Sequence, residues 1–565
     1  MALYLANFPK LKQSMLAQQG SSVFVDLQFI DELKAPEDGH CNDEELKLDE
    51  SIVVKHAYYF FQIFKVFIGD LIFSSEEREI SRQYFQKVSA MDALRVISVE
   101  LQFIYDILYT KALVLHFKLS YFFRFIAFTH IVSAFILFNR LKSDKIHAPD
   151  VRITYSLLLG GIALDVISLL RLILSDWTVA EFKLYNKKLS QQYSFLNNLV
   201  SAMDHLRKPQ FATCTQPNAT VTYKVLNTPL IFQRWSESIS ACNFFSEFLK
   251  ESPRKMHKQN RSWGILVLCN ICCFPIFMAM KIISCFQQAG GGTRVGGGGR
   301  GAFMHDRGLM ITEMKYVSKN PFINKLWIYI FEEVRRKAKD ANDLTKVKEI
   351  FDARGGMFLQ SIAQEIDCGN LSAFVTGANY DFAILTWHIA TEMWYNMEKQ
   401  NMNSTLRNEE REFSKILSDY MMYLLLNKPS ATSVVRGTFE MTVDKASLEM
   451  MQNGCNTTNV ERLCEKLFHV PTETFNLTSP LGEGMKLAHE MERLREEKWK
   501  VMAGVWVEML SYAAIHIKGN EHVLLLSKGG ELLTFVWLLM AHFGCFYKPE
   551  WGISRERFHM YRPAR

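Results

Sequence analysis

The sequence of 565 residues lacks the patterns that identify most enzymes and metal centres. It contains no Gly-x-Ser-x-Gly nucleophile elbow and no paired-cysteine metal pattern. His489-Glu490 begins a zinc-protease motif, but Arg493 stands where the second histidine would be needed. We therefore predict no catalytic residue, no metal and no cofactor. An enzyme is the less favoured hypothesis but stays open, because catalytic groups also converge from distant parts of a chain.

A disulfide framework and a basic stripe are missing as well. The 11 cysteines are an odd number and are scattered without paired spacings, which fits a reducing compartment. The formal net charge is only +6, and no run of basic residues is interleaved with aromatic residues. We predict that the protein has no nucleic-acid partner.

Apolar residues are abundant. They make up 48% of the chain, which includes 42 phenylalanines, while charged residues stay at an ordinary 22%. This mixture indicates some membrane helices joined to a large soluble part. Strand-like alternation is scarce, so the predicted fold class is mainly α, with membrane-associated helices followed by a soluble helical domain.

Three apolar runs are about long enough to cross a bilayer, namely Leu119–Phe138, Ile153–Leu174 and Trp263–Phe286. The loop between the first two is short and basic, so we expect these two helices to form a hairpin. The positive-inside rule assigns to the cytosol both this loop and the basic cluster before the third run, although one span separates them. We expect a multi-pass membrane protein with membrane lipid as a partner, and the topology stays open.

Ionisable residues within the first two runs are candidate functional groups. Asp165 is costly in lipid, so it should face other helices or water and have a partner. Arg124 on the preceding helix and Arg171 on the same helix are the candidate partners. A structural ion pair that fixes the helix register is favoured over an ion pathway, since only one acidic residue lies in these two runs.

The most patterned stretch lies near the C-terminus, at Trp506–Gly544. Apolar residues three or four apart predict an amphipathic helix over Met485–Ala513, followed by a turn around Gly519. A second helix is expected from Gly530-Glu531 onward. It is apolar on all sides but too short to span a bilayer, so we predict the buried helix of a helical hairpin.

Between these helices lies the short loop Ser527, Lys528, Gly529 and Gly530. One hypothesis is an anion site built from backbone amides, a lysine and a helix N-terminus. The favoured alternative is a structural loop whose glycines permit a tight entry into the helix. The neighbouring histidines His516, His522 and His542 have no carboxylate or cysteine at ligand spacing, so packing or surface roles are favoured over a metal site.

Two stretches carry a resemblance to known domains. Ser156–Thr178, with the text SLLLGGIALDVISLLRLILSDWT, resembles the domain of unknown function DUF4220. Trp506–Gly544 resembles the C-terminal domain DUF594 of the same plant membrane-protein family. Members of that family carry further apolar helices upstream, so the resemblance implies a DUF4220 region that is partial and N-terminally shortened here. It implies family membership and no activity.

The composition shifts divide the chain into regions. A flexible glycine-rich linker, GGGTRVGGGGRG, separates the membrane part from the soluble part. The predicted regions are an N-terminal helical and loop region (1–110), a membrane region resembling DUF4220 (111–289), the linker (290–301), a soluble helical region (302–499), a DUF594-like hairpin (500–547) and a tail (548–565).

Three functions follow as hypotheses. The leading one is a non-enzymatic scaffold or partner-binding membrane protein whose helical C-terminal domain binds protein partners. The second is a membrane-bound enzyme, or a binder of lipid head groups that uses the loop at Ser527–Gly530. The third is a component of a transporter or channel that conducts along the helix carrying Asp165.

Overall fold

A computed structural model shows a mainly α-helical protein. It describes residues 48–547 except for 66–67, 69–74, 111–117, 142–147, 174, 186–209, 216–221, 228–233, 235–237, 250–313, 318–321, 340, 342, 402–408, 429–431, 433–438, 453–456, 458, 472–473, 477 and 528–531. The predicted linker 290–301 and the third apolar run Trp263–Phe286 therefore lie outside the described residues.

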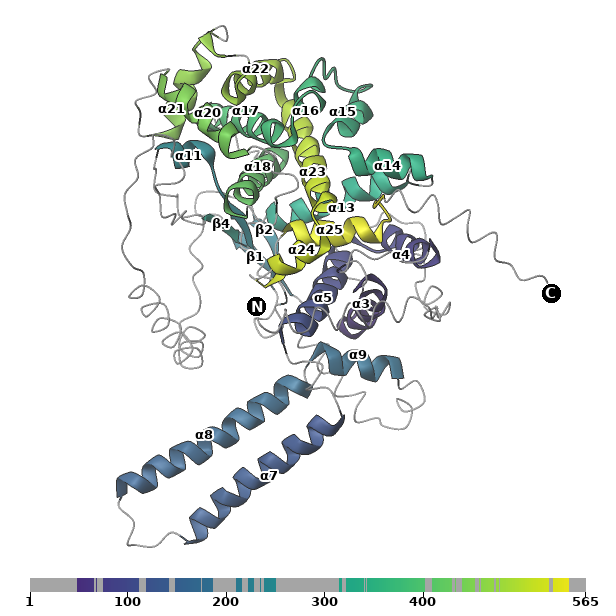
Figure 1. The fold of residues 1–565 in the computed structure, drawn as a ribbon, viewed down its shortest axis with the longest axis vertical. Helices are drawn as coiled ribbons and strands as arrows, with labels where there is room; N and C mark the ends of the chain where they lie inside the picture. The colour runs from purple at the N-terminus through teal and green to yellow at the C-terminus, as the bar shows by residue number, and fades with distance from the viewer. Residues whose placement is uncertain are drawn as a thin grey trace, which may run out of the picture.

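The helices follow one another along the chain with few strands between them (Figure 1). The N-terminal helices are α3 (Glu50–Phe64), α4 (Ser75–Lys87) and α5 (Ala90–Tyr109). A long hairpin and its continuation follow as α7 (Lys118–Leu141), α8 (Ala148–Ile173) and α9 (Asp176–Tyr185). The remaining helices are α11 (Phe244–Leu249), α13 (Phe322–Lys339), α14 (Leu344–Asp352), α15 (Gly356–Ile362), α16 (Ala373–Thr376), α17 (Tyr380–Asn401), α18 (Glu409–Asn427), α20 (Phe439–Gln452), α21 (Val460–Phe468), α22 (Pro480–Glu492), the 3₁₀ helix η4 (Arg495–Glu497), α23 (Lys498–His516), α24 (Gly519–Leu526) and α25 (Leu532–His542).

Two short antiparallel strand pairs are present that the sequence pattern did not predict. Strand β1 (Gln210–Thr215) pairs with β2 (Thr222–Asn227), and β3 (Ser238–Ala241) pairs with β4 (Met314–Val317). A pairing of four residues is too short to leave a clear period-two pattern in a sequence. The β3–β4 pair also joins chain segments on either side of residues 250–313.

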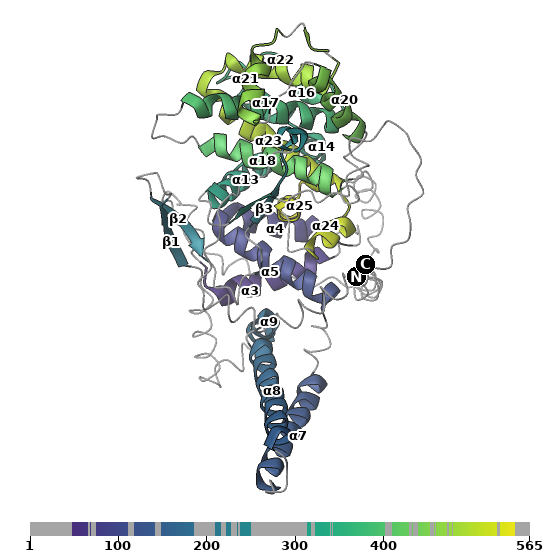
Figure 2. The ribbon, with the colours of Figure 1, turned by 90° about the vertical axis from the view of Figure 1, so that its left-hand side faces the viewer.

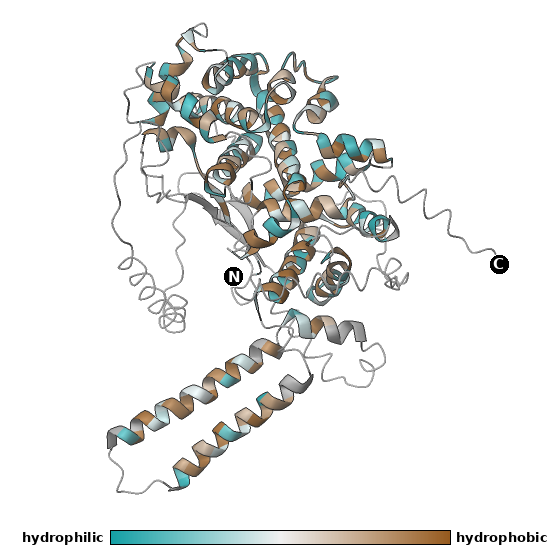
Figure 3. Ribbon diagram, viewed as in Figure 1, coloured by the Kyte–Doolittle hydropathy of each residue, from teal (hydrophilic) through white to brown (hydrophobic). Residues whose placement is uncertain are grey.

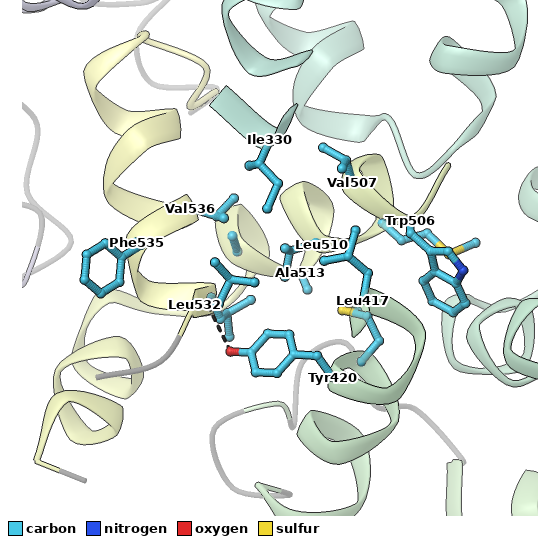
Figure 4. Close-up of a cluster of buried hydrophobic side chains, with 14 of the residues drawn as sticks. Ile330, Leu417, Tyr420, Trp506, Val507, Leu510, Ala513, Leu532, Phe535 and Val536 are labelled. Atoms are coloured by element: carbon cyan, nitrogen blue, oxygen red, sulfur yellow. Dashed lines mark hydrogen bonds between the residues drawn. The ribbon is translucent and has the colours of Figure 1, made fainter. Parts of the chain in front are cut away.

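We call the described helices other than α7, α8 and α9 the body. The core of the body forms around α23 and α25, the two longer helices of the C-terminal stretch. Every residue of α25 is buried, as expected for a helix that is apolar on all sides. Figure 4 shows Leu510 and Ala513 of α23 facing Leu532 and Val536 of α25, with α18 below them. The Tyr420 hydroxyl accepts a hydrogen bond of 2.9 Å from the backbone N–H of Leu533. The prediction that this apolar run is a buried helix is therefore confirmed.

Two predicted details of this stretch are wrong. The single helix expected over Met485–Ala513 is interrupted: α22 ends at Glu492 and α23 begins at Lys498, with η4 between them. Arg495 in that break has a positive φ of 50°, which a continuous α-helix does not contain. The turn expected around Lys518-Gly519-Asn520 is confined to Ile517 and Lys518, because a further helix, α24, begins at Gly519.

A buried carboxylate ties α23 to two other helices. Glu508 of α23 accepts hydrogen bonds from the backbone N–H groups of Met357 and Phe358 at 3.1 and 2.9 Å, and it forms an ion pair with Lys337 of α13. Carboxylates are favourable at helix N-termini, where backbone N–H groups lack partners within the helix. Gly504 on the same helix has the Phe358 ring where a side chain would stand, so only glycine permits this close approach.

The N-terminal helices belong to the same body as the C-terminal ones. The Trp327 indole donates to the carbonyl of Ala90 at 2.8 Å, and the Tyr109 hydroxyl donates to the carbonyl of Val523 at 3.0 Å. Buried residues of α3 and α5 are part of one apolar cluster with those of α23 and α25. Figures 1 and 2 show the hairpin of α7 and α8 projecting from this body.

Candidate functional site

The projecting hairpin exposes a large apolar surface, which Figure 3 shows along both of its helices. Apart from Met441, Leu448 and Met451 on α20, every large exposed apolar residue in the described part of the chain lies on this hairpin. These residues are Phe122, Phe123, Phe125, Ile136 and Leu137 on α7 and Ile153, Leu157, Leu159, Leu164, Val166, Ile167 and Leu169 on α8. Soluble proteins rarely leave an apolar surface of this extent in water.

The dimensions of the hairpin match a bilayer. Helices of 24 and 26 residues are about 36 and 39 Å long at 1.5 Å per residue, against a hydrocarbon core of about 30 Å. Within the described residues one helix is long and apolar enough to cross a membrane by itself, over Phe122–Arg140, and none of that stretch is buried. The apolar part of α8, Ile153–Leu169, is slightly shorter.

The two helices of the hairpin meet along an aromatic seam near its tip. Tyr155 packs edge-on against Phe135 and Phe138, with ring centroids 5.9 and 5.2 Å apart, and its hydroxyl donates to the Asn139 side-chain carbonyl at 2.9 Å. Gly161 lies beside Ile131 further along the seam. These contacts confirm the predicted hairpin of two antiparallel helices.

Asp165 lies half-buried on this hairpin, and its Oδ2 atom is buried without a hydrogen-bond partner among the described residues. The antiparallel register that pairs Ile131 with Gly161 sets Asp165 near the level of Phe128, one turn from the half-buried Arg124. The described residues contain no ion pair between Asp165 and Arg124, and the side chain of Arg171 is not among them. The expected partner of Asp165 stays a prediction.

Buried charges attach the base of the hairpin to the body. Arg234 binds Asp176 of α9 with Nε and Nη2 at 2.9 and 3.1 Å, and its Nη1 lies 3.3 Å from Glu50 of α3. Arg95 of α5 continues the network, with hydrogen bonds of 2.6 Å to Glu50 and Asp92. Because an unpaired buried charge is very costly, this network fixes the orientation in which α9 leaves the body.

An aspartate with a raised pKa lies at the same base. The Trp177 indole of α9 donates to Asp106 Oδ2 of α5 at 3.1 Å, and Gln102 donates to Oδ1 at 2.8 Å. The pKa of Asp106 is raised to about 6, chiefly because burial disfavours the charged form; the two hydrogen bonds oppose this rise and the nearby Asp176 adds to it. The charge of Asp106 therefore changes within the physiological pH range.

The proposed anion loop is only partly described. Ser527 ends α24, and its hydroxyl donates to the carbonyl of Leu524 at 2.7 Å, while Lys528, Gly529 and Gly530 lie outside the described residues. The N–H of Leu533, in the first turn of α25, already donates to the Tyr420 hydroxyl. That amide is therefore already engaged, and the anion site at Ser527–Gly530 stays a prediction.

A buried Ser81–His542–Glu100 chain is a feature that sequence reasoning missed. His542 Nδ1 lies 2.8 Å from the Ser81 hydroxyl, and His542 Nε2 lies 2.9 Å from Glu100 Oε2. The rings of Phe60, Phe64 and Phe85 surround His542, with Phe85 stacked at 4.1 Å. No local spacing could reveal it, because 461 residues separate Ser81 from His542.

The three hydrogen-bonded side chains Ser81, His542 and Glu100 are the residue types of a hydrolase triad, but their surroundings indicate a structural role. Ser81, Glu100 and His542 are all fully buried, so no substrate reaches the hydroxyl. Desolvation raises the pKa of Glu100 well above its ordinary value and lowers the pKa of His542 well below its own. Both shifts favour the neutral forms of the two groups, whereas a triad needs a carboxylate that stabilises an imidazolium.

The other histidines are separate from one another. His388 is fully buried on α17; its Nδ1 lies 2.7 Å from the Ser418 hydroxyl and its Nε2 accepts from the Phe244 N–H, so it is a hydrogen-bonded core histidine. His522 is buried against the Trp537 ring, and His516 stacks on Tyr512. Within the described residues no group of three histidines, cysteines or carboxylates could hold a metal ion.

Comparisons with known proteins identify two regions of the chain. Residues 1–248 match the model of a domain of unknown function, DUF4220, and residues 491–545 match the model of a protein of unknown function, DUF594. The first match includes the elements from α3 to β3, so it extends well before the Ser156–Thr178 stretch, and the second includes α23 to α25. No curated protein and no solved structure matches the chain.

Proposed function

Because this chain belongs to the family that joins a DUF4220 domain to a DUF594 domain, we propose that it is a membrane-anchored, non-enzymatic binding protein. The hairpin of α7 and α8 is the anchor. The helical body, built from parts of both domains, is the module that binds protein partners on one side of the membrane.

The exposed apolar surface of the hairpin carries this proposal. Leu157 and Leu164 are 70% and 69% exposed, and the other apolar residues named above on α7 and α8 are exposed as well. Removing such a side chain from water is worth about 1.5–3 kcal/mol when its burial is complete. Lipid tails can cover the outward sides of both helices at the same time. A single groove on a protein partner would cover only one side.

The body constrains how the chain crosses the membrane. Helix α5 precedes the hairpin and α25 follows it, yet both are part of one apolar cluster. The segments before and after the hairpin must therefore lie on the same side of the membrane. The same holds for Ala241 and Met314, which pair in β3 and β4, so the chain between them crosses the bilayer an even number of times or not at all. Under this proposal, the third apolar run does not cross the membrane alone.

A partner-binding role for the body is supported by its exposed apolar side chains. Met441, Leu448 and Met451 are 61%, 58% and 54% exposed on α20, seven and three residues apart, which sets them on one face of that helix. Methionine-rich surfaces adapt well to protein partners. Capture experiments should use the full chain, because a fragment starting at residue 302 would lose α3 to α5 and expose the core around α25.

Extraction of membranes with alkaline carbonate tests the anchor. We expect the wild-type protein to stay in the membrane pellet. The double substitution Leu157→Asp and Leu164→Asp should release the protein or prevent its insertion, since each charge at the centre of a spanning helix costs about 2.5–3.5 kcal/mol. The matched control Leu448→Asp on α20, which is exposed to a similar degree, should stay in the pellet. Release of the wild-type protein would overturn the proposal.

The transport hypothesis retains one observation in its favour, the partnerless buried oxygen of Asp165. Polar atoms of this kind within a membrane segment mark ion or proton pathways in many proteins. Purified protein in sealed liposomes should then show an ion flux that disappears with Asp165→Asn. No flux above that of empty liposomes would leave the anchor as the role of the hairpin.

A further inference from the structure

A cavity opens in the body at the end opposite the hairpin. It has a volume of about 490 Å³ and lies where α16, the start of α17 and the first turn of α22 meet. Figures 1 and 2 both show these helices at the far end of the molecule from α7 and α8. A membrane-anchored body would therefore present this cavity to the aqueous compartment.

The lining combines apolar walls with few polar groups. Phe374 and Phe382 supply two aromatic rings, and Asn379 and Thr386 supply an amide and a hydroxyl. Thr386 is only 1% exposed, and its hydroxyl has no hydrogen-bond partner among the described residues. A buried hydroxyl without a partner is unfavourable, and a ligand group that reached it would relieve this.

Glu483 is the one ionisable residue among those that line the cavity, and its carboxylate is the group that attracts a cation there. It belongs to the first turn of α22 and its side chain is 24% exposed. Lys486 on the next turn lies 4.0 Å from the Glu483 carboxylate, and its ammonium lies 5.6 Å from the centroid of the Phe374 ring. This corner therefore already accommodates an ammonium group between a carboxylate and an aromatic face.

The walls of the cavity are held apart by close packing next to it. A side chain at Gly484 would meet Ile389 at 2.7 Å and the backbone carbonyl of Thr386 at 3.2 Å. Helices α17 and α22 thus already touch at this glycine, and they cannot move closer to fill the space beside it.

We propose that this cavity binds a small organic amine with an aromatic or branched apolar tail. The ligand ammonium takes the position of the Lys486 ammonium beside Glu483 and over Phe374. The tail packs between Phe374 and Phe382, and a polar group on it bonds with the Thr386 hydroxyl. Lys486 acts as an internal competitor that leaves when the ligand enters, since half of its side chain is already exposed to solvent.

Calorimetric titration of the full chain in detergent, with 2-phenylethylamine as the probe, tests this proposal. We expect saturable binding, and binding weaker by about tenfold or more for the neutral 2-phenylethanol, which lacks the ammonium. Glu483→Gln should weaken amine binding to a similar extent. Lys486→Ala should tighten it, because the competing ammonium is gone.

Two controls separate the site from general effects on folding. Glu490→Gln lies on the same helix in an exposed pair with Arg493 and should leave amine binding unchanged. Thermal unfolding without ligand should be similar for all three variants, because each replaced side chain is partly exposed. No binding of the amine at millimolar concentration, equal binding of the alcohol, or unchanged binding in Glu483→Gln would each overturn the proposal.

Discussion

At the scale of single residues, His542 connects the two domains of the chain. It lies within the DUF594 match, whereas its partners Ser81 and Glu100 lie within the DUF4220 match. We expect His542→Ala to destabilise the body by about 3–5 kcal/mol, because it leaves a cavity among three rings and two buried polar groups without partners. Thermal unfolding in detergent measures this. His516→Ala, at a partly exposed histidine, is the control and should have a much smaller effect.

The substitution Glu100→Gln tests whether the hydrogen bond between Glu100 and His542 joins two neutral groups or two charged ones. Burial favours the neutral forms of Glu100 and His542, so we expect the amide of glutamine to donate to His542 Nε2 as a carboxylic acid does. We expect a change in the free energy of unfolding below about 1 kcal/mol. A decrease in the free energy of unfolding as large as that of His542→Ala would show that Glu100 and His542 form a charged pair.

Asp106 should make the base of the hairpin sensitive to pH. Its pKa is about 6 in the folded protein against an ordinary 3.8, so the folded state binds more protons between these values. Its contribution to stability therefore grows as the pH falls from about 7 to 4, and it is lost as the pH rises through 6. The buried histidines His388 and His522, with pKa values lowered to about 3, act in the opposite direction below pH 6.5.

The difference between the wild type and Asp106→Asn isolates this contribution. Since the histidines are common to both proteins, the melting temperature of the wild type should rise relative to that of the variant as the pH is lowered from 7 to 5. The effect is bounded by about 3 kcal/mol, because one pKa unit corresponds to about 1.4 kcal/mol. A constant difference across this pH range would contradict the raised pKa.

At the scale of elements, the sequence was most informative where one period ran for many residues. The runs at Leu119–Phe138 and Ile153–Leu174 correspond closely to α7 and α8, and the apolar run after Gly530 corresponds to α25. The break at Arg495 and the short strands β1 to β4 were missed, since each depends on a few residues and on packing against distant segments. The Ser81–His542–Glu100 chain depends on packing alone and left no local signal.

If α8 spans a membrane as proposed, Asp165 should set the cost of its insertion. A carboxylate near the middle of a spanning helix costs about 3 kcal/mol relative to leucine in insertion assays. If the residue has only a structural role, Asp165→Leu should raise the fraction of protein that inserts and resists carbonate extraction. The neighbouring Leu164→Ile should leave that fraction unchanged. A lower inserted fraction in Asp165→Leu would show that the carboxylate has a partner on which the hairpin depends.

At the scale of the whole molecule, the hairpin of α7 and α8 projects from a single helical body that contains elements from both before and after it in the sequence. Helices α3 to α5 precede the hairpin, and they share one core with α13, α18, α23 and α25, which follow it. The charge clusters alone left the topology open, because the positive-inside rule treats each loop separately. The packing of α5 with α25 and the pairing of β3 with β4 decide which segments lie together.

Protease protection in sealed membranes tests this account most directly. One tag is inserted in each of the connections 69–74, 142–147 and 290–301, and one follows residue 565. We predict that the tags at 69–74, 290–301 and 565 are digested from the same side, and that the tag at 142–147 is protected from that side. Tags at 69–74 and 565 on opposite sides, or a tag at 142–147 on the same side as the others, would contradict a body anchored by a membrane-spanning hairpin.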